Sequence, residues 1–273
     1  IIRFKGFSLT DFQGYPNITI LMDYKENGSL KKLIEREQKK NAPRDYNNTA
    51  KQIILCGIAH GMMTLHSRRV LHRDLKPDNV LLDSEFKPCI TDFGLSKFSD
   101  PEHSGNQSMN GCGTPRYMAP EIIDGTHYGF KSDVYSFGIL MYEVLAGKEA
   151  FSGEMKKKKF SLIAFHEKIL QGVRPEFDFS IKPSLKELIE RCWSGDPKQR
   201  PTFQELFIKL SLSLDDDDAV EHTVYNLINN DDSAEHSYNS RYSLDNVDAR
   251  AVSSYVDEIT IMDTDDEAFE HIK

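Results

Sequence analysis

What this sequence of 273 residues lacks already excludes several classes of protein. It has no run of about eighteen apolar residues, so we predict no membrane span. Its four cysteines are scattered and form no Cys-x-x-Cys pair, which is typical of free thiols in a reducing compartment. We therefore expect a cytoplasmic protein. Residues 1–4 show neither an initiator Met nor a signal-peptide pattern, so we expect the chain to be a fragment.

The charge is unevenly distributed along the chain. Residues 211–273 carry 17 acidic and 3 basic side chains, a net charge of −14, whereas the remainder has 31 basic and 26 acidic side chains, a net charge of +5. A mildly basic body suits a nucleotide site but does not indicate nucleic-acid binding. We expect residues 215–273 to form an acidic, flexible tail of unknown partner. A short helix within 248–260 is plausible there, because four apolar residues recur at helical spacing: Val252, Tyr255, Val256 and Ile259.

The most informative stretch is 72–94, in which two short apolar runs flank a polar tip. That pattern predicts a β-hairpin, and closing the hairpin brings Asp74, Lys76 and Asn79 near Asp92. Carboxylate and amide oxygens suit Mg²⁺, and a lysine supplies a point charge for phosphate oxygens. No cysteine or imidazole pair at ligand spacing lies nearby, so zinc is a poor fit.

Three motifs in this order resemble those of a eukaryotic protein kinase domain over about residues 1–214. They are His72-Arg73-Asp74 with Asn79, then Asp92-Phe93-Gly94, then Ala119-Pro120-Glu121. The resemblance implies an α+β fold with a mostly helical C-terminal lobe at 26–214. Residues 1–25 would be a β-strand remnant of the N-terminal lobe and the hinge.

That resemblance also implies the chemistry, which is transfer of the ATP γ-phosphoryl group to a Ser or Thr hydroxyl of a protein with Mg²⁺ bound. Asp74 would orient the acceptor hydroxyl and accept its proton, and Lys76 would neutralise charge on the moving phosphoryl group. Asn79 and Asp92 would hold the metal ions. Thr114 would bond Asp74 and Lys76, and it would begin the loop that docks the substrate's next residue.

Four further residues are implied to contact the nucleotide. Asp23 and Tyr24 would lie in the hinge that hydrogen-bonds adenine, Leu81 would pack beneath the adenine ring, and Met22 would guard the pocket behind it. Met22 taken alone would be interpreted as a core residue, and its position before the hinge favours the role at the pocket. The Ser/Thr-type catalytic loop together with Arg191-Cys192-Trp193 resembles the tyrosine-kinase-like branch.

Local patterns predict several structural features. Residues 2–9 and 18–24 suit strands, and 49–66 suit a long helix. Two further helix starts are expected, at Ser29 as an N-cap and at Ser132 or Asp133, the latter helix ending at Gly147 and buried on all sides. Ser184–Glu187 and Thr202–Glu205 both match a capping box. By resemblance, His72 would pack against Phe93 above Asp133, and Glu121 would pair with Arg200.

The stretch 95–118 is rich in Ser, Gly and Asn up to Gly113, which is typical of a mobile loop. A phosphorylated serine there would pair with Arg73, and Ser108, then Ser104, are the candidates. For any single serine, a plain flexible loop with solvent-facing hydroxyls is the favoured explanation.

One departure from the kinase pattern leaves alternatives open. No Gly-x-Gly-x-x-Gly occurs, and the family's phosphate-anchoring Lys strand and the helix with its partner Glu are absent as well. The fragment could therefore be inactive, and a kinase-like scaffold without catalysis is the alternative function. A kinase of small molecules is a third hypothesis, against which the sequence of residues 112–121 argues.

Overall fold

The computed structural model describes residues 1–98, 113–126, 128–156 and 160–212. Ser104, Ser108 and the whole acidic tail lie outside these ranges, so the phosphorylation candidates and the predicted helix at 248–260 are not tested. The helices are α1 (Leu30–Gln38), α2 (Asn48–Ser67), α3 (Pro120–Ile123), α4 (Phe130–Ala146), α5 (Ser152–Met155), α6 (Leu162–Leu170), α7 (Pro183–Cys192) and α8 (Phe203–Leu212), with short 3-10 turns η1 (Pro77–Asn79), η2 (Phe93–Leu95), η3 (Pro115–Tyr117) and η4 (Pro197–Gln199).

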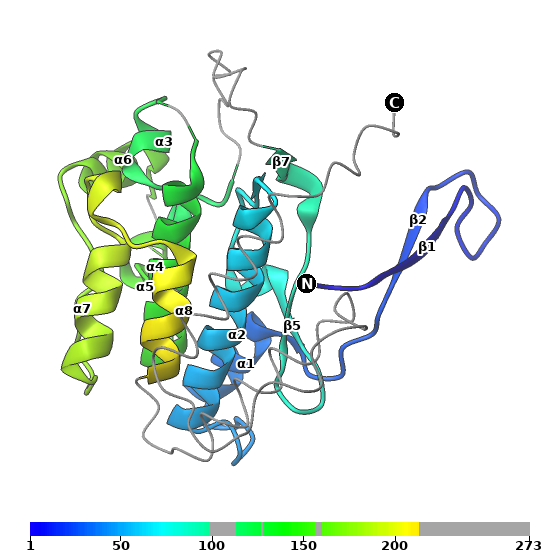
Figure 1. The fold of residues 1–273 in the computed structure, drawn as a ribbon, viewed down its shortest axis with the longest axis horizontal. Helices are drawn as coiled ribbons and strands as arrows, with labels where there is room; N and C mark the ends of the chain where they lie inside the picture. The colour runs from blue at the N-terminus through cyan, green and yellow to red at the C-terminus, as the bar shows by residue number, and fades with distance from the viewer. Residues whose placement is uncertain (99–112, 127, 157–159, 213–273) are drawn as a thin grey trace, which may run out of the picture.

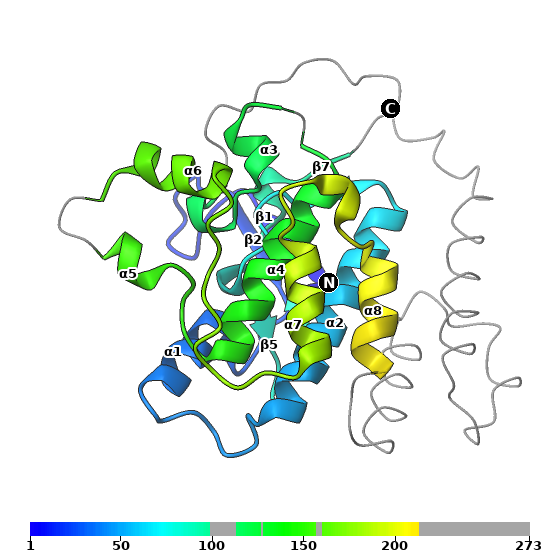
Figure 2. The ribbon, with the colours of Figure 1, turned by 90° about the vertical axis from the view of Figure 1, so that its left-hand side faces the viewer.

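Helix α4 is the central element of the helical body, with α2, α7 and α8 beside it (Figure 2). Every residue from Ser132 to Val144 is buried, which confirms the prediction of a helix covered on all sides. The helix ends at Gly147, whose φ of 62° lies in the left-handed region that glycine adopts without strain. Among the described residues, no helix combines the length and apolarity that crossing a bilayer requires.

Within the described ranges, three small antiparallel sheets accompany the helices, which confirms the α+β class. They pair β1 (Phe4–Ser8) with β2 (Thr19–Met22), β3 (Gly28–Ser29) with β5 (Val80–Leu82) and β6 (Pro88–Ile90), and β4 (Val70–Leu71) with β7 (Lys97–Phe98). The β1–β2 hairpin extends away from the helical body (Figure 1). Its apolar side chains are 42–92% exposed, namely Phe4, Phe7, Leu9, Phe12, Tyr15, Ile18, Ile20, Leu21, Met22 and Tyr24.

The predicted helix starts differ in outcome. Ser29 is the N-cap residue of α1, as predicted, but its side chain makes no cap hydrogen bond. Helix α4 begins at Phe130 rather than at Ser132 or Asp133, since the Asp133 carboxylate binds other groups.

The two predicted capping boxes differ in outcome. The Ser184 box is wrong, because α7 begins at Pro183 with Lys182 as its N-cap and no side chain caps it. The Thr202 box is confirmed, because Thr202 N–H donates to Glu205 Oε2 at 2.6 Å and Glu205 N–H donates to Thr202 Oγ1 at 3.1 Å.

Candidate active site

The hairpin at 72–94 forms as predicted and brings its two flanks together. Val80 pairs with Ile90 and Leu82 with Pro88 in antiparallel register. At the open end, Thr91 N–H donates to the Asn79 carbonyl at 2.9 Å. Because Asp92 follows Thr91 directly, the Asn79 and Asp92 positions face each other across the end of the hairpin.

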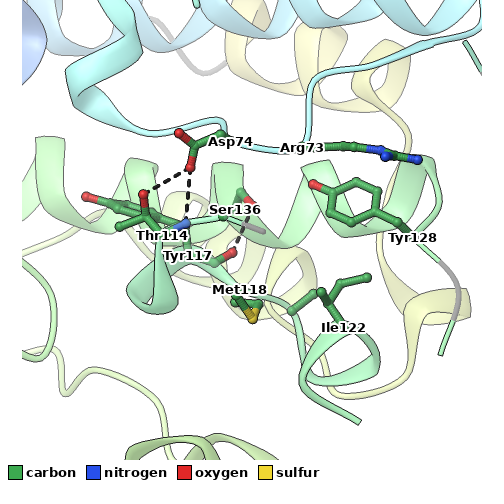
Figure 3. Close-up of a pocket in the computed structure, with 10 residues that line it drawn as sticks. Arg73, Asp74, Thr114, Tyr117, Met118, Ile122, Tyr128 and Ser136 are labelled. Carbon is green, nitrogen blue, oxygen red and sulfur yellow. Dashed lines mark hydrogen bonds between the residues drawn. The ribbon is translucent and has the colours of Figure 1, made fainter. Parts of the chain in front are cut away.

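Asp74, Lys76 and Thr114 form one hydrogen-bonded cluster, shown in part in Figure 3. Thr114 donates to Asp74 Oδ1 from its hydroxyl at 3.0 Å and from its backbone N–H at 3.2 Å. Lys76 Nζ donates to the other carboxylate oxygen of Asp74 and, at 2.8 Å, to Thr114 Oγ1. The predicted contacts of Thr114 with Asp74 and Lys76 are therefore present. The carboxylate is thereby fixed in orientation by groups from two separate segments of the chain.

Asn79 and Asp92 together fit the requirements of a magnesium ion. The Asn79 side-chain N–H₂ donates to the Asp74 carbonyl at 2.9 Å and to Asp74 Oδ2 at 3.1 Å, which turns its amide oxygen away from Asp74. Asp92 is exposed and has a left-handed backbone with φ of 63°. Sparsely populated conformations of this kind concentrate at functional sites. One amide and one carboxylate oxygen suit a cation that keeps several waters and binds phosphate oxygens.

His72 and Asp133 support the loop from inside. The fully buried His72 packs against Phe93 with ring centroids 5.4 Å apart, as expected. Its Nδ1 accepts from Asp74 N–H at 3.3 Å and its Nε2 lies 3.1 Å from the Thr91 carbonyl, a pattern that suits the neutral imidazole. Burial lowers the pKa of His72, with Asp133 opposing that shift. The ring therefore joins the loop that carries Asp74 to Thr91, the residue before Asp92.

The Asp133 carboxylate is fully buried and makes four polar contacts. It accepts from His72 N–H at 3.0 Å, from Arg73 N–H at 2.9 Å and from the Tyr128 hydroxyl at 2.8 Å, and its Oδ2 lies 2.9 Å from His66 Nε2. Burial acts to raise the pKa of Asp133, but His66 and the two N–H groups lower it overall. The carboxylate therefore remains charged and holds the backbone of the loop.

Arg73 and Asp74 leave the loop in opposite directions, and Arg73 lies beside Tyr128 (Figure 3). The Arg73 guanidinium carbon is 5.5 Å from the centroid of the Tyr128 ring, within cation–π range. The cavity between this loop, Met118 and Ile122 measures only about 10 Å³. That space holds at most a single water, so the loop that carries Arg73 and Asp74 packs directly on residues 113–122.

A second polar cluster lies beneath residues 115–118 and was missed from the sequence. The buried Glu143 of α4 accepts from the Tyr117 hydroxyl at 2.7 Å, from Arg116 Nη1 at 3.2 Å and from Ala150 N–H at 2.8 Å. Burial raises the pKa of Glu143 to about 7 even though these donors lower it. A single acidic residue inside an otherwise apolar helical stretch was the available signal. Tyr128 was also missed, and nothing in its sequence context marks it.

Glu121 and Arg200 form the expected pair in a two-pronged geometry. Arg200 Nη1 and Nη2 each lie 2.7 Å from one Glu121 carboxylate oxygen, and Arg200 is only 2% exposed. Arg200 also donates to the carbonyls of Ser194 and Lys131 at 2.9 and 2.8 Å. The end of the 113–121 segment is thereby tied to the loop before α8.

The structure brings only some of the four residues predicted to contact adenine close to the Asp92 end of the hairpin. Met22 Sδ lies 4.0 Å from Thr91 Oγ1, so Met22 reaches the residue before Asp92, and Leu81 is half-buried on β5. The Asp23 N–H donates to the Arg3 carbonyl at 3.2 Å and its carboxylate pairs with Lys5 at 2.9 Å. The backbone N–H of Asp23 is therefore already occupied within the chain. Tyr24 is 81% exposed.

Comparison with known proteins agrees with this geometry. Residues 1–209 match the family model described as the protein kinase domain. Receptor-interacting serine/threonine-protein kinase 4 of Mus musculus is 38% identical over 200 residues, which cover 69% of this chain and 24% of that protein. Receptor-interacting serine/threonine-protein kinase 3 of Homo sapiens is 35% identical over 219 residues, which cover 77% of this chain and 41% of that protein.

A protein of Dictyostelium discoideum named as a probable serine/threonine-protein kinase is 37% identical over 190 residues, covering 68% of this chain. The matched region spans 13% of that relative, so the chain corresponds to a minor part of several of the proteins it resembles. The family model covers both segments that build the Asp74 cluster. The chain belongs to the protein kinase domain family.

Proposed function

We propose that this protein is a serine/threonine kinase that transfers the γ-phosphoryl group of ATP to hydroxyl groups of protein substrates. The observation that carries the proposal is the Asp74 carboxylate held by Thr114 and Lys76. An oriented carboxylate beside a lysine ammonium supplies both the acceptor for the hydroxyl proton and the charge that phosphoryl transfer needs.

Each residue of the cluster takes one role in this proposal. Asp74 orients the acceptor hydroxyl and takes its proton, while Lys76 lies close enough to neutralise charge on the transferred group. Asn79 and Asp92 would hold magnesium, which when bound supplies positive charge to the phosphate oxygens. Thr114 positions Asp74 and does not itself need to contact the phosphate.

The nucleotide would lie between Met22, Tyr24 and Leu81, with the Asp23 carbonyl oxygen as one adenine partner. We place the strand remnant and hinge at residues 1–25 and the helical lobe at 26–214, with an acidic tail at 215–273. A cytoplasmic location is proposed from the cysteine usage, since Cys56, Cys89 and Cys192 are free thiols. We propose no nucleic-acid partner.

A binding module without catalysis is the second candidate. It is favoured by the exposed apolar surface of the β1–β2 hairpin, since exposed apolar patches often mark interaction sites. The hydrogen-bonded Asp74 cluster favours the enzyme, because a scaffold has no need to orient that carboxylate.

Phosphate transfer from Mg²⁺-ATP to a serine-containing protein separates the two candidates. The full-length protein should transfer phosphate, and Asp74→Asn should lower the rate by about 100-fold or more while nucleotide binding is nearly unchanged. Asp178→Asn is the matched control, because that carboxylate is exposed and pairs only with Lys148 among the described contacts. Full activity of Asp74→Asn would overturn the assignment, and no transfer by the wild type would favour the binding module.

A further inference from the structure

A surface groove between α7 and α8 lies outside the Asp74 cluster and is not used by the proposed chemistry. It has a volume of about 300 Å³, and its lining includes Leu185, Glu187, Leu188 and Arg191 from α7 and Lys209 and Leu212 from α8. Helix α7 packs on α4 and α8 packs on α2, and the two lie near each other in Figures 1 and 2. The groove is therefore the space between two helices that rest on different neighbours.

The apolar part of this groove is incompletely covered. Leu185 and Leu188 are each 4% exposed, whereas Leu212 at the end of α8 is 52% exposed. The other two leucines of α8, Leu206 and Leu210, are fully buried. Burying the Leu212 side chain under a second apolar segment would remove apolar surface from water, which is favourable.

The charges of the groove favour an acidic occupant. Arg191 and Lys209 contribute two positive charges and Glu187 one negative charge, which leaves one positive charge in excess. Among the described residues, neither Arg191 nor Lys209 forms an ion pair, whereas Lys186 of α7 pairs with Glu190. Two cations of the groove are thus available to carboxylates that approach it.

The chain that follows α8 begins at the edge of the groove and is acidic. Leu212 is followed by Ser213 and Leu214 and then by four consecutive aspartates at 215–218. The six residues 213–218 can span at most about 20 Å when extended, whereas the ten-residue helix α7 is about 15 Å long. The aspartates and the residues after them can therefore reach every part of the groove.

The residues after the four aspartates combine polar and apolar side chains in a regular order. Val220, Val224, Leu227 and Ile228 follow one another at spacings of four, three and one residues. That spacing predicts one apolar face on a helix at 219–228. An acidic stretch followed by an apolar face matches a groove that offers both cations and exposed leucine surface.

We propose that residues 215–228 of the same chain occupy the α7–α8 groove. The aspartates at 215–218 lie against Arg191 and Lys209, and the apolar face of 219–228 covers Leu212. The short connection favours this occupant over a separate protein, because a short flexible linker gives an effective concentration in the millimolar range. This inference does not depend on the kinase function.

Hydrogen exchange of the full-length protein, followed by mass spectrometry, tests the proposal. After correction for sequence-dependent intrinsic rates, the amides of 219–228 should exchange at least about fivefold more slowly than those of 230–241, a polar stretch of the same tail. Raising the salt concentration to about 1 M should reduce this protection, because salt screens the attraction between the aspartates and the two cations.

Charge reversal identifies the groove as the docking site. Lys209→Glu and Arg191→Glu should each speed exchange at 219–228 by up to about fivefold, the effect of losing one exposed ion pair. Lys209 is exposed, so Lys209→Glu keeps the test decisive if Arg191→Glu fails to fold. Adding Asp216→Lys to Lys209→Glu should restore part of the protection, because the two charges are exchanged.

Lys198→Glu is the matched control. It reverses an exposed cation on η4 that does not line the groove, and it should leave exchange at 219–228 unchanged. Equal exchange of 219–228 and 230–241, or an unchanged rate in Lys209→Glu, would overturn the proposal. Protection that increases with protein concentration would also overturn it, because the tail would then occupy the groove of a second copy.

Discussion

Arg200 and Glu121 are joined by two parallel hydrogen bonds of 2.7 Å, although 79 residues separate them in the sequence. Burial acts to raise the pKa of Glu121, but the hydrogen bonds and charge of Arg200 lower it overall. A carboxyl whose pKa is lowered on folding stabilises the folded state at any pH above its pKa in the unfolded chain, which is about 4.5. That contribution is lost as the pH falls through the pKa of the folded state. The pair therefore stabilises the protein at neutral pH, and its contribution decreases as the pH falls below about 4.5.

Removing one member of this pair should strand the other as a buried charge. We predict that Arg200→Met lowers the free energy of unfolding by about 3–5 kcal/mol, measured by urea denaturation at pH 7. The double variant Arg200→Met with Glu121→Gln should be more stable than Arg200→Met alone, because no unpaired charge remains. Equal stabilities of the single and double variants would contradict this account.

Glu143 should make stability depend on pH in the opposite direction. Its pKa is raised by burial to about 7 from an unfolded value of 4.5, so the folded state binds its proton more tightly. That contribution is fully present below about pH 4.5 and is lost as the pH rises to about 7. Glu143→Gln removes the titration, so the stability of the variant relative to the wild type should rise by on the order of 3 kcal/mol between pH 5 and pH 8.

Urea denaturation at several pH values measures this difference. Tyr117→Phe checks its cause, because the Tyr117 hydroxyl donates to Glu143 and lowers its pKa. Without that hydroxyl, the pKa of Glu143 should be higher, so the loss of stability that accompanies its deprotonation should occur at higher pH. A difference between wild type and Glu143→Gln that stays constant with pH would show that Glu143 is not protonated in the folded state.

The two capping-box sequences should respond differently to the same kind of substitution. Thr202→Ala removes a cap that satisfies Glu205 N–H and should cost about 1 kcal/mol of stability. Ser184→Ala should change the stability by less than about 0.5 kcal/mol, because Ser184 caps nothing. Thermal denaturation of the two variants in parallel checks this, and equal losses would be inconsistent with the helix starts described above.

Close packing at Gly138 gives a further prediction. A Cβ at this position would lie 2.7 Å from Cys192 Cβ and 3.2 Å from Trp193 N, so α4 and α7 would have to separate. Gly138→Ala should therefore destabilise the protein by about 1–3 kcal/mol. Gly153→Ala is the control, since an added Cβ there meets nothing within 4 Å, and alanine favours the helix by about 0.5–1 kcal/mol. Calorimetry on both variants tests whether Gly138→Ala lowers the melting temperature while Gly153→Ala raises it.

The cluster of Asp74, Lys76 and Thr114 could be predicted from the sequence because its residues belong to short, ordered patterns. The hairpin at 72–94 was predictable because two short apolar runs around a polar tip are typical of two strands that pair with each other. The structure shows this pairing, since Thr91 N–H donates to the Asn79 carbonyl. The contacts of Thr114 with Asp74 and of Glu121 with Arg200 were expected only from resemblance, because no local pattern joins segments 40 or 79 residues apart.

Features that depend on tertiary packing were not predictable in this way. The Ser184 box matched its pattern, but Pro183 at the first helical position sets the start of α7 instead. The start of α4 was misplaced because the Asp133 carboxylate serves His72 and Arg73 rather than its own helix. The Glu143 cluster depends on which residues fold over α4, and periodicity along the helix carries no information about them.

The packing of α2 against α8 has a consequence for how the chain is made. Cys56 of α2 and Ser211 of α8 are 155 residues apart, yet Sγ and Oγ lie 3.1 Å from each other in the interior. Ribosomes add about 5–20 residues per second, so α2 waits roughly 10–30 s for the helix that covers it. During that interval, the apolar face of α2 that packs on α8 is exposed and can be bound by chaperones.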